Sequence, residues 1–315
     1  MGTLSAPPSD AFLARVRHGE MGGVLLLGRW RSPAEITATT EALQQAACLR
    51  GEPLLVAVDQ EGGDVRRLAW APPSVAPAAM GSPARALREA AVTAVALRRV
   101  GVDVDFAPVA DAPSSARSFL GTRAFSRSPR VAAELTTAFV EGLQHGGVAA
   151  TAKHFPGLGE AGANTDDAAV TIRASAWKLR EGLLPFRAAV AAGVQLVMVS
   201  SAAYPALDPS GLPAVFSKRL LGGLLRDDLG FTGVAVTDAL DAPGAVHLSH
   251  PATRSIAAGT DLLIFGSEAA SERAYATLVS DTPKYPHLRA RLAESAQRIR
   301  ELKTWLTDEG GPTCP

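Results

Sequence analysis

Lys153 and His154 stand side by side at the end of an apolar run, VAATA (148–152), and a loop rich in glycine and alanine follows them. A lysine in such a place acts either as a Schiff-base nucleophile or as a fixed hydrogen-bond donor. The stiff Phe-Pro pair behind His154 favours a fixed geometry for binding. Because parallel strands carry their chemistry at their carboxyl ends, the pair predicts the rim of an active site.

Two aspartates also follow apolar runs. Asp59 comes directly after LLVAV (54–58), and two glycines behind it let the backbone approach a ligand. The alternative is that Asp59 only caps the next helix. Asp238 closely follows GVAV (233–236), so its carboxylate should face the same rim as a candidate nucleophile. No His-x-His or His-x-x-x-His pair accompanies it, and we expect neither a metal site nor a cofactor.

Other charged residues near the strand ends have more than one interpretation. Arg66 and Arg67 follow Asp59 within one turn. Arg123 lies in a long loop, where an arginine either holds a carboxylate or hydroxyl group or is simply solvated. Three aspartates surround the segment FAPVAD, and we expect one or two of them only to cap or bridge strands: Asp103, Asp105 and Asp111.

Seven short apolar runs predict buried parallel strands. They are GGVLLLG (22–28), PLLVAVD (53–59), GVDVDFAP (101–108), VAATAKHF (148–155), VQLVMVSSA (194–202), GVAVTDA (233–239) and TDLLIFG (260–266). Helical patterns that begin near Ser or Pro lie between them, as at 32–50, 84–101 and 129–147. Strand–helix units without a linker predict an α/β fold with one TIM-like (β/α)8 barrel over residues 1–315. We expect its first strand, before residue 22, to be short or missing.

The overall charge and the cysteines exclude several classes of protein. Lys+Arg and Asp+Glu are both 31, which gives no electrostatic reason to expect nucleic acid or an acidic membrane as the partner. No apolar run approaches the roughly 20 residues of a membrane span. We expect a soluble, cytoplasmic protein as given, or a secreted or cell-surface one if a signal segment was removed. With only Cys48 and Cys314, the second in a fraying tail, we expect no disulfide framework or zinc site.

Five segments in this order resemble glycoside hydrolase family 3, in particular its single-domain bacterial β-N-acetylglucosaminidase branch. They are DQEGGDVRRL (59–68), VDVDFAPVAD (102–111), GTRAF (121–125), KHFPGLG (153–159) and GFTGVAVTDAL (230–240). The resemblance implies a TIM-like barrel and retention of configuration through a covalent glycosyl-enzyme. It implies that Asp238 is the nucleophile and that five residues hold the sugar: Asp59, Arg67, Arg123, Lys153 and His154.

The sequence departs from this branch at the general acid/base. In the branch, KHFPG continues with His-Gly and later with Asp-Ser-His, whose Asp-His dyad moves the proton. Here Leu158 replaces the first His, and Ala168 stands at the dyad His if Asp166 is its Asp. Larger members place a Glu on a second domain, but residues 267–315 make only about two helices. We therefore expect Asp166 or Asp167 as the substitute proton donor, with His247 and His250 as the histidines that could also reach the site.

Three functions remain open. The first is a retaining β-glycosidase, most readily a β-N-acetylhexosaminidase acting on a small carbohydrate of cell-wall or chitin origin. The second is a sugar-binding family member with weak or lost hydrolysis. The third is a Schiff-base lyase built on Lys153, which explains neither Asp238 nor DQEGG. Since the nucleophile and the sugar clamp are both intact, the sequence favours the glycosidase.

Overall fold

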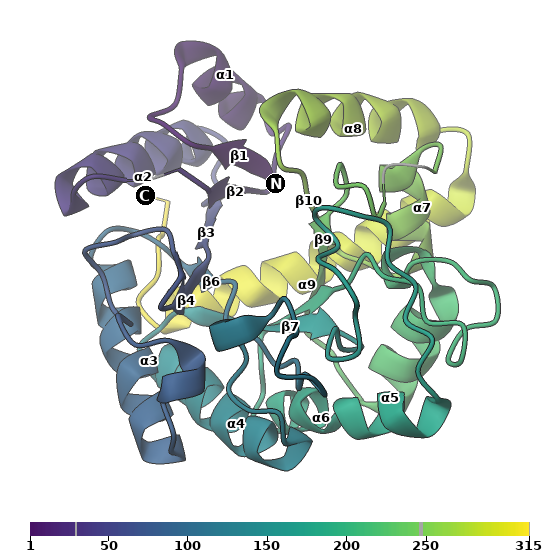
Figure 1. The fold of residues 1–315 in the computed structure, drawn as a ribbon. Helices are drawn as coiled ribbons and strands as arrows, with labels where there is room; N and C mark the ends of the chain where they lie inside the picture. Colours follow the sequence, from purple (N-terminus) through teal and green to yellow (C-terminus); the bar gives the residue numbers. More distant parts are fainter. Residues whose placement is uncertain (29, 246–247, 315) are drawn as a thin grey trace.

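The computed structural model describes residues 1–28, 30–245 and 248–314. Eight parallel strands form a nearly closed barrel (Figure 1). Around the barrel their order is β1 (Gly2–Leu4), β2 (Gly23–Leu26), β3 (Leu55–Val58), β6 (Val104–Asp105), β7 (Ala149–Phe155), β8 (Leu196–Val199), β9 (Val234–Ala239) and β10 (Leu262–Ile264). The TIM-like barrel is confirmed, and each of the seven apolar runs contains one of its strands.

The first strand is short, as expected. β1 has three residues and pairs in parallel with β2, with Gly2 opposite Val24. On its other side, the amino group of Met1 donates to the carbonyl oxygen of Leu263 at 2.5 Å, and Oγ1 of Thr3 donates to that of Phe265 at 2.5 Å. Although β1 is short, it is held on both sides, by β2 and by the segment that contains β10. It therefore brings the two ends of the sheet together.

Helices surround the barrel and begin where the sequence signals them. Ser32 and Ser82 accept hydrogen bonds from the backbone N–H groups of Glu35 and Arg85, and each is followed by proline at the first helical position. The helices of the described residues are α1 (Asp10–His18), α2 (Pro33–Cys48), α3 (Pro83–Arg98), α4 (Pro129–His145), α5 (Ala176–Gly182), α6 (Leu184–Ala191), α7 (Pro251–Ala258), α8 (Glu268–Asp281) and α9 (Pro286–Asp308), with the short or irregular η1 (Pro77–Ala79), η2 (Gly121–Arg123), η3 (Ala214–Phe216) and η4 (Arg219–Asp228). None of them is both long and apolar enough to cross a membrane.

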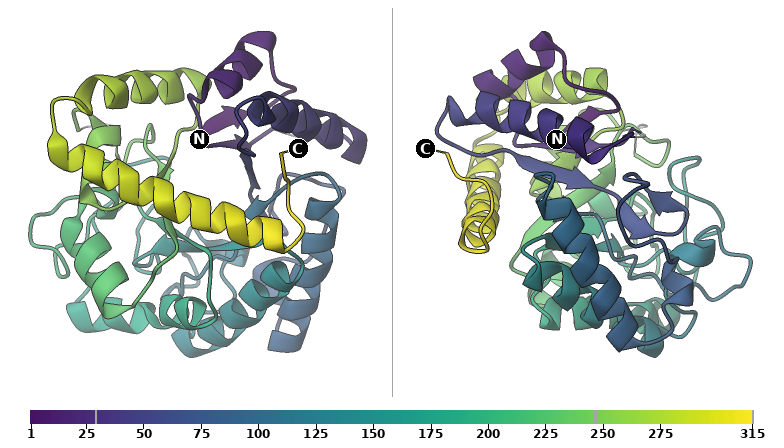
Figure 2. Two further views of the ribbon diagram at one scale, coloured as in Figure 1. Left: turned by 180° about the vertical axis from the view of Figure 1, so that it is seen from behind. Right: turned by 90° about the vertical axis from the view of Figure 1, so that its left-hand side faces the viewer.

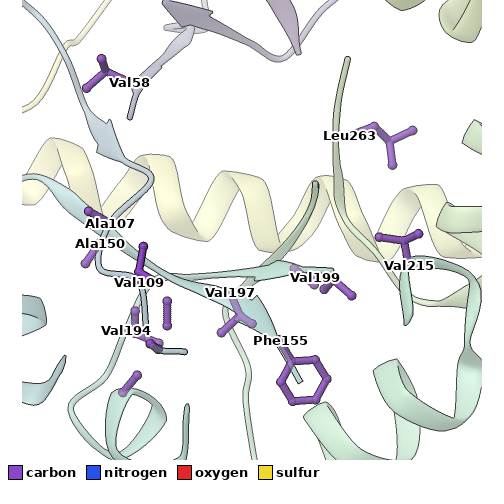
Figure 3. Close-up of a cluster of buried hydrophobic side chains, with 14 of the residues drawn as sticks. Val58, Ala107, Val109, Ala150, Phe155, Val194, Val197, Val199, Val215 and Leu263 are labelled. Atoms are coloured by element: carbon purple, nitrogen blue, oxygen red, sulfur yellow. The ribbon is translucent and has the colours of Figure 1, made fainter. Parts of the chain in front are cut away.

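Alternation along the strands creates two apolar layers. On β8, Val197 and Val199 belong to the layer between strands and helices, which Figure 3 shows with Phe155 at the end of β7. Leu196 and Met198 belong to the second layer, inside the barrel. The interior of the barrel is thus filled with side chains, so a ligand can bind only at one of the two ends of the barrel.

The helix α9 closes the end of the barrel opposite the strand β4 (Gln60–Gly62). This helix crosses behind the strands in Figure 1, and the right panel of Figure 2 shows it on the far side from β4. Its residues Leu302 and Leu306 join the apolar layer inside the barrel. The open end is therefore the one at which the strands finish.

The expectation of an unbonded, frayed C-terminus was wrong. Cys314 forms a disulfide with Cys48, the last residue of α2, across a sequence separation of 266. The chain end reaches α2 because α9 carries it back beneath the barrel (Figure 2). The path of α9 therefore brings together two cysteines that are distant in the sequence. Their spacing in the sequence does not reveal this contact.

Candidate active site

Lys153, near the end of β7, is buried between two carboxylates. Its Nζ lies 2.7 Å from Oδ1 of Asp59, directly after β3, and 2.7 Å from Oε1 of Glu61 in β4. Burial would lower the pKa of Lys153, but Asp59 and Glu61 outweigh it and raise the pKa above its usual value. A lysine held protonated in this way is a fixed hydrogen-bond donor and a poor Schiff-base nucleophile.

The segment after Asp59 is a hairpin and not the start of a helix. β4 pairs in antiparallel fashion with β5 (Val65–Arg66), so Asp59 does not cap a helix. The hairpin turns Glu61 back over the barrel, where its two oxygens accept from Nε and Nη2 of Arg123, both at 2.8 Å. Arg123 in the long loop is thus fixed by a bidentate ion pair and is not a solvated residue.

Arg67 lies at the outer edge of this group. Its Nε stands 4.0 Å from Oδ2 of Asp59, and its side chain is 41% exposed. Its backbone N–H donates to the carbonyl oxygen of Asp59 at 3.2 Å. The guanidinium therefore faces the opening, where it can contact a bound ligand.

His154 is oriented by Asp111. Nδ1 of His154 lies 2.7 Å from Oδ2 of Asp111, which also accepts from the backbone N–H of His154, while Oδ1 accepts from that of Leu158. Asp103 and Asp105 instead accept from the backbone N–H groups of Val56 and Gln60 and so link β6 to the β3 segment. The expectation that one or two of the three aspartates only bridge strands is confirmed for Asp103, whereas the pKa of Asp105, raised by burial, is also influenced by Lys153, Asp59 and Glu61.

Asp238 lies near the carboxyl end of β9. Its Oδ1 accepts from the backbone N–H of Ala239 at 2.9 Å, and its Oδ2 accepts from Oγ1 of Thr165 at 3.3 Å. Burial raises the pKa of Asp238, the charge of Asp166 adds to this increase, and His154 opposes it. Asp238 therefore shares one electrostatic environment with the two loops that follow β7 and β9.

The loop after β7 is anchored at Thr165 and exposed at the two following aspartates. Thr165 is buried, whereas Asp166 and Asp167 are exposed. Nδ2 of Asn164 donates to Oδ2 of Asp166 at 3.3 Å. The charge of Asp166 raises the pKa of Asp238, which places Asp166 close to the candidate nucleophile. The hydroxyl group of Thr165 thus ties the segment that carries Asp166 to the candidate nucleophile.

The two other candidate histidines have different outcomes. Nδ1 of His250 lies 2.8 Å from Oδ2 of Asp281, at the end of α8, so the interpretation of His250 as a reserve proton donor is not supported. His247 lies outside the described residues. Within the described part of the chain, no three His, Cys, Asp or Glu side chains come together as a metal site.

Sequence reasoning missed Glu61 and Thr165 as parts of the site. Both are about 1% exposed and both touch residues that were singled out. Glu61 stands inside the DQEGG segment, two residues after Asp59, which places both side chains near the same strand end. The DQEGG segment therefore contained a signal for Glu61. For Thr165 the only signal was its position next to Asp166 and Asp167 in the loop.

Glu61→Gln should weaken the fold in a pH-dependent way. Burial alone would raise the pKa of Glu61, but Lys153 and Arg123 outweigh it and lower the pKa from 4.5 to about 2. Removing one member of a buried ion-pair network costs roughly 3–5 kcal/mol at neutral pH. Because the pKa in the folded state is depressed, Glu61 stabilises the protein above about pH 4.5, and this contribution is lost as the pH falls towards 2.

Urea unfolding of wild type and variant at pH 7 and pH 3 measures this difference. Asp64→Asn is the matched control, since this exposed carboxylate accepts only from Thr122 in the described contacts and should change stability little at either pH. An equal loss at both pH values for Glu61→Gln would contradict the assignment of its stability to the ionised carboxylate.

Comparison with known proteins agrees with this geometry. Residues 1–302 match the model of the glycosyl hydrolase family 3 N terminal domain. The chain is 33% identical over 314 residues to a β-hexosaminidase of Nitrosomonas eutropha, with 93% of this chain and 89% of the relative covered. It is 37% identical over 277 residues to a β-hexosaminidase of Pseudomonas aeruginosa, covering 84% and 80%.

Two solved structures show the same barrel. A family 3 β-N-acetylglucosaminidase from Paenibacillus superposes with a TM-score of 0.92 at 30% identity, covering all of this chain, which spans 62% of that longer protein. A β-N-acetylhexosaminidase from Beutenbergia cavernae superposes with a TM-score of 0.87 at 31% identity, covering 96% and 95%. By sequence and by structure, the chain belongs to glycosyl hydrolase family 3.

Proposed function

We propose that this chain is a retaining β-N-acetylhexosaminidase in which Asp238 is the nucleophile. The observation that carries the proposal is the position of Asp238 at the open end of the barrel, with its carboxylate oriented by Thr165 and by the backbone of Ala239. A carboxylate fixed in this way can attack the anomeric carbon of a bound sugar. The names of the similar enzymes support an N-acetylhexosaminide as substrate.

The sugar would lie against the polar group around Lys153. With Lys153 and Arg123 held by Glu61, the carboxylate of Asp59 keeps lone pairs for sugar hydroxyls. Arg67 and His154 complete the set at the rim and beside the nucleophile. These side chains form a clamp that fixes one sugar ring relative to Asp238.

Asp166 is our choice as proton donor. In the first step Asp238 would form the bond to the anomeric carbon while Asp166 transfers its proton to the departing oxygen. In the second step Asp166 would accept a proton from water, whose oxygen replaces Asp238 and restores the original configuration. Its position supports this choice over Asp167, because Asp166 directly follows Thr165, whose hydroxyl group donates to Asp238, and because the charge of Asp166 raises the pKa of Asp238.

We propose further that residues 1–315 act as one catalytic domain on sugars of cell-wall or chitin origin. For its location we propose the secreted or cell-surface alternative over the cytoplasm. The disulfide between Cys48 and Cys314 supports this choice, because such bonds persist mainly in oxidising compartments.

A panel of nitrophenyl β-glycosides that differ only in the sugar tests the proposed function. We expect kcat/KM for the N-acetylglucosaminide to exceed that for the glucoside and the xyloside by at least about tenfold, since a missing N-acetyl group loses binding that the site is built to use. Nuclear magnetic resonance should show the β-anomer released first. Binding of N-acetylglucosamine without turnover of any glycoside would instead favour the sugar-binding alternative.

A further inference from the structure

A second cavity with strong positive charge lies outside the barrel. It has a volume of about 350 Å³ and is formed by η4, the end of α7 and one face of α9. We call it the basic pocket and define it by six of its lining residues: Lys218, Gly222, Arg226, His287, Arg291 and Arg298. None of these residues belongs to the candidate active site. The helix α9, which contributes to the pocket, closes the end of the barrel opposite the active site.

The arginines of the basic pocket converge on one buried carboxylate. Asp261, at the start of β10, accepts from Nη2 of Arg226 at 2.6 Å, from Nη2 of Arg291 at 2.9 Å and from Nη1 of Arg298 at 3.0 Å. Arg291 also pairs with the exposed Glu294 at 2.6 Å. Since one buried carboxylate and one exposed one face four cationic side chains, the pocket keeps a surplus of positive charge.

The surplus of positive charge acts on Arg226. Burial, together with the charges of Arg298 and Arg291, lowers the pKa of Arg226 to about 10, although Asp261 opposes this change. An arginine whose charge is disfavoured by its surroundings gains from a nearby anion. The pocket would therefore be stabilised by a ligand that brings negative charge.

Two of the cations keep donors that the protein itself does not use. Lys218 makes no ion pair with any described residue, and Arg298 uses only Nη1 in the contacts of the described chain. The planar fork of a guanidinium group matches the oxygens of a phosphate, and a lysine adds a point charge beside it. At Gly222, which also lines the pocket, an added Cβ would meet nothing within 4 Å, so there is free space beside it.

The geometry points to a second ligand site: we propose that the basic pocket binds the phosphate group of a small phosphorylated molecule. Its volume lies at the lower end of the range of roughly 300–1,000 Å³ that small-molecule sites occupy. The pocket is therefore larger than a single phosphate ion needs. The proposal does not depend on the reaction at Asp238. It adds to a carbohydrate-binding barrel a separate site whose ligand carries charge.

Isothermal titration of the full chain in phosphate-free buffer tests the proposal with three probes: glucose 6-phosphate, inorganic phosphate and glucose. We expect saturable binding of glucose 6-phosphate that weakens as sodium chloride rises from 50 to 500 mM, and no binding of glucose to this site. Tighter binding of glucose 6-phosphate than of phosphate identifies a carried phosphate group as the ligand. Equal binding of glucose 6-phosphate and inorganic phosphate would identify the free phosphate ion, which has the same chemistry, as the ligand.

Variants locate the binding. Gly222→Trp should fill the pocket and weaken binding at least about tenfold, whereas Gly223→Trp, on the neighbouring face of η4 where a Cβ also meets nothing, should leave it unchanged. Lys218→Gln and Arg298→Gln should each weaken binding about 10- to 100-fold, the usual value of a hydrogen bond to a charged group.

A cooperative melting transition of each variant serves as the check on folding, and hydrolysis of a nitrophenyl β-glycoside should remain at the wild-type rate. Absence of saturable phosphate binding in wild type would overturn the proposal. So would undiminished binding by a folded, active Gly222→Trp protein, because the ligand would then lie elsewhere.

Discussion

Asp238→Asn is expected to lower kcat on the order of 10⁴-fold or more, while the fold and the affinity for sugar stay nearly unchanged. The amide has the shape of the carboxylate but cannot form the covalent bond to the anomeric carbon. Its oxygen can still accept a hydrogen bond from Thr165 or Ala239. Because burial raises the pKa of Asp238, replacing this buried carboxylate by a neutral amide should not lower the melting temperature.

Three measurements separate chemistry from binding in this variant. They are kcat on dinitrophenyl β-N-acetylglucosaminide, the Kd of N-acetylglucosamine by titration, and the melting temperature. Asp241→Asn is a matched control, since Asp241 lies just after β9 and accepts from the backbone N–H of Gly266 and from Ser267. If Asp238→Asn keeps most of the wild-type activity, Asp238 is not the nucleophile.

How far the sequence predicts this fold can be judged strand by strand. The runs that became β2, β3, β7, β8 and β9 are apolar, β-branched and bounded by turn signals, so local pattern alone finds them. β1 escapes because three residues with only one large apolar side chain carry no period that a window could detect. The disulfide escapes because it depends on the path of α9 beneath the barrel.

The same distinction applies to the site. Asp59 directly follows β3, and Lys153 and Asp238 lie near the carboxyl ends of β7 and β9, so the parallel topology alone predicts that they lie at one end of the barrel. Glu61 depends on the turn of the β4–β5 hairpin, whose strands are three and two residues long. Thr165 depends on how a loop folds over β9. Local pattern therefore predicts residues that lie at the ends of barrel strands, but not residues such as Glu61 and Thr165 that depend on the folding of the segments between them.

The proton donor that we propose, Asp166, can be tested with leaving groups of different basicity. Dinitrophenol departs without a proton, whereas a sugar alkoxide does not. With an exposed Asp166 in place of the Asp-His dyad, we expect slow but measurable release from dinitrophenyl β-N-acetylglucosaminide and much weaker hydrolysis of natural disaccharides.

Asp166→Ala should then slow disaccharide hydrolysis by about 10²–10⁴-fold, the usual value of general acid/base help, and should slow cleavage of the dinitrophenyl substrate far less. Asp167→Ala is the matched control, because Asp167 is the next residue and is also exposed, whereas Asp166 is the one whose charge raises the pKa of Asp238. The deciding quantity is the slope of log kcat/KM against the pKa of the leaving group, which should become steeper in Asp166→Ala only. An unchanged slope in both variants would mean that the proton comes from another residue, and a steeper slope in Asp167→Ala alone would assign the role to Asp167.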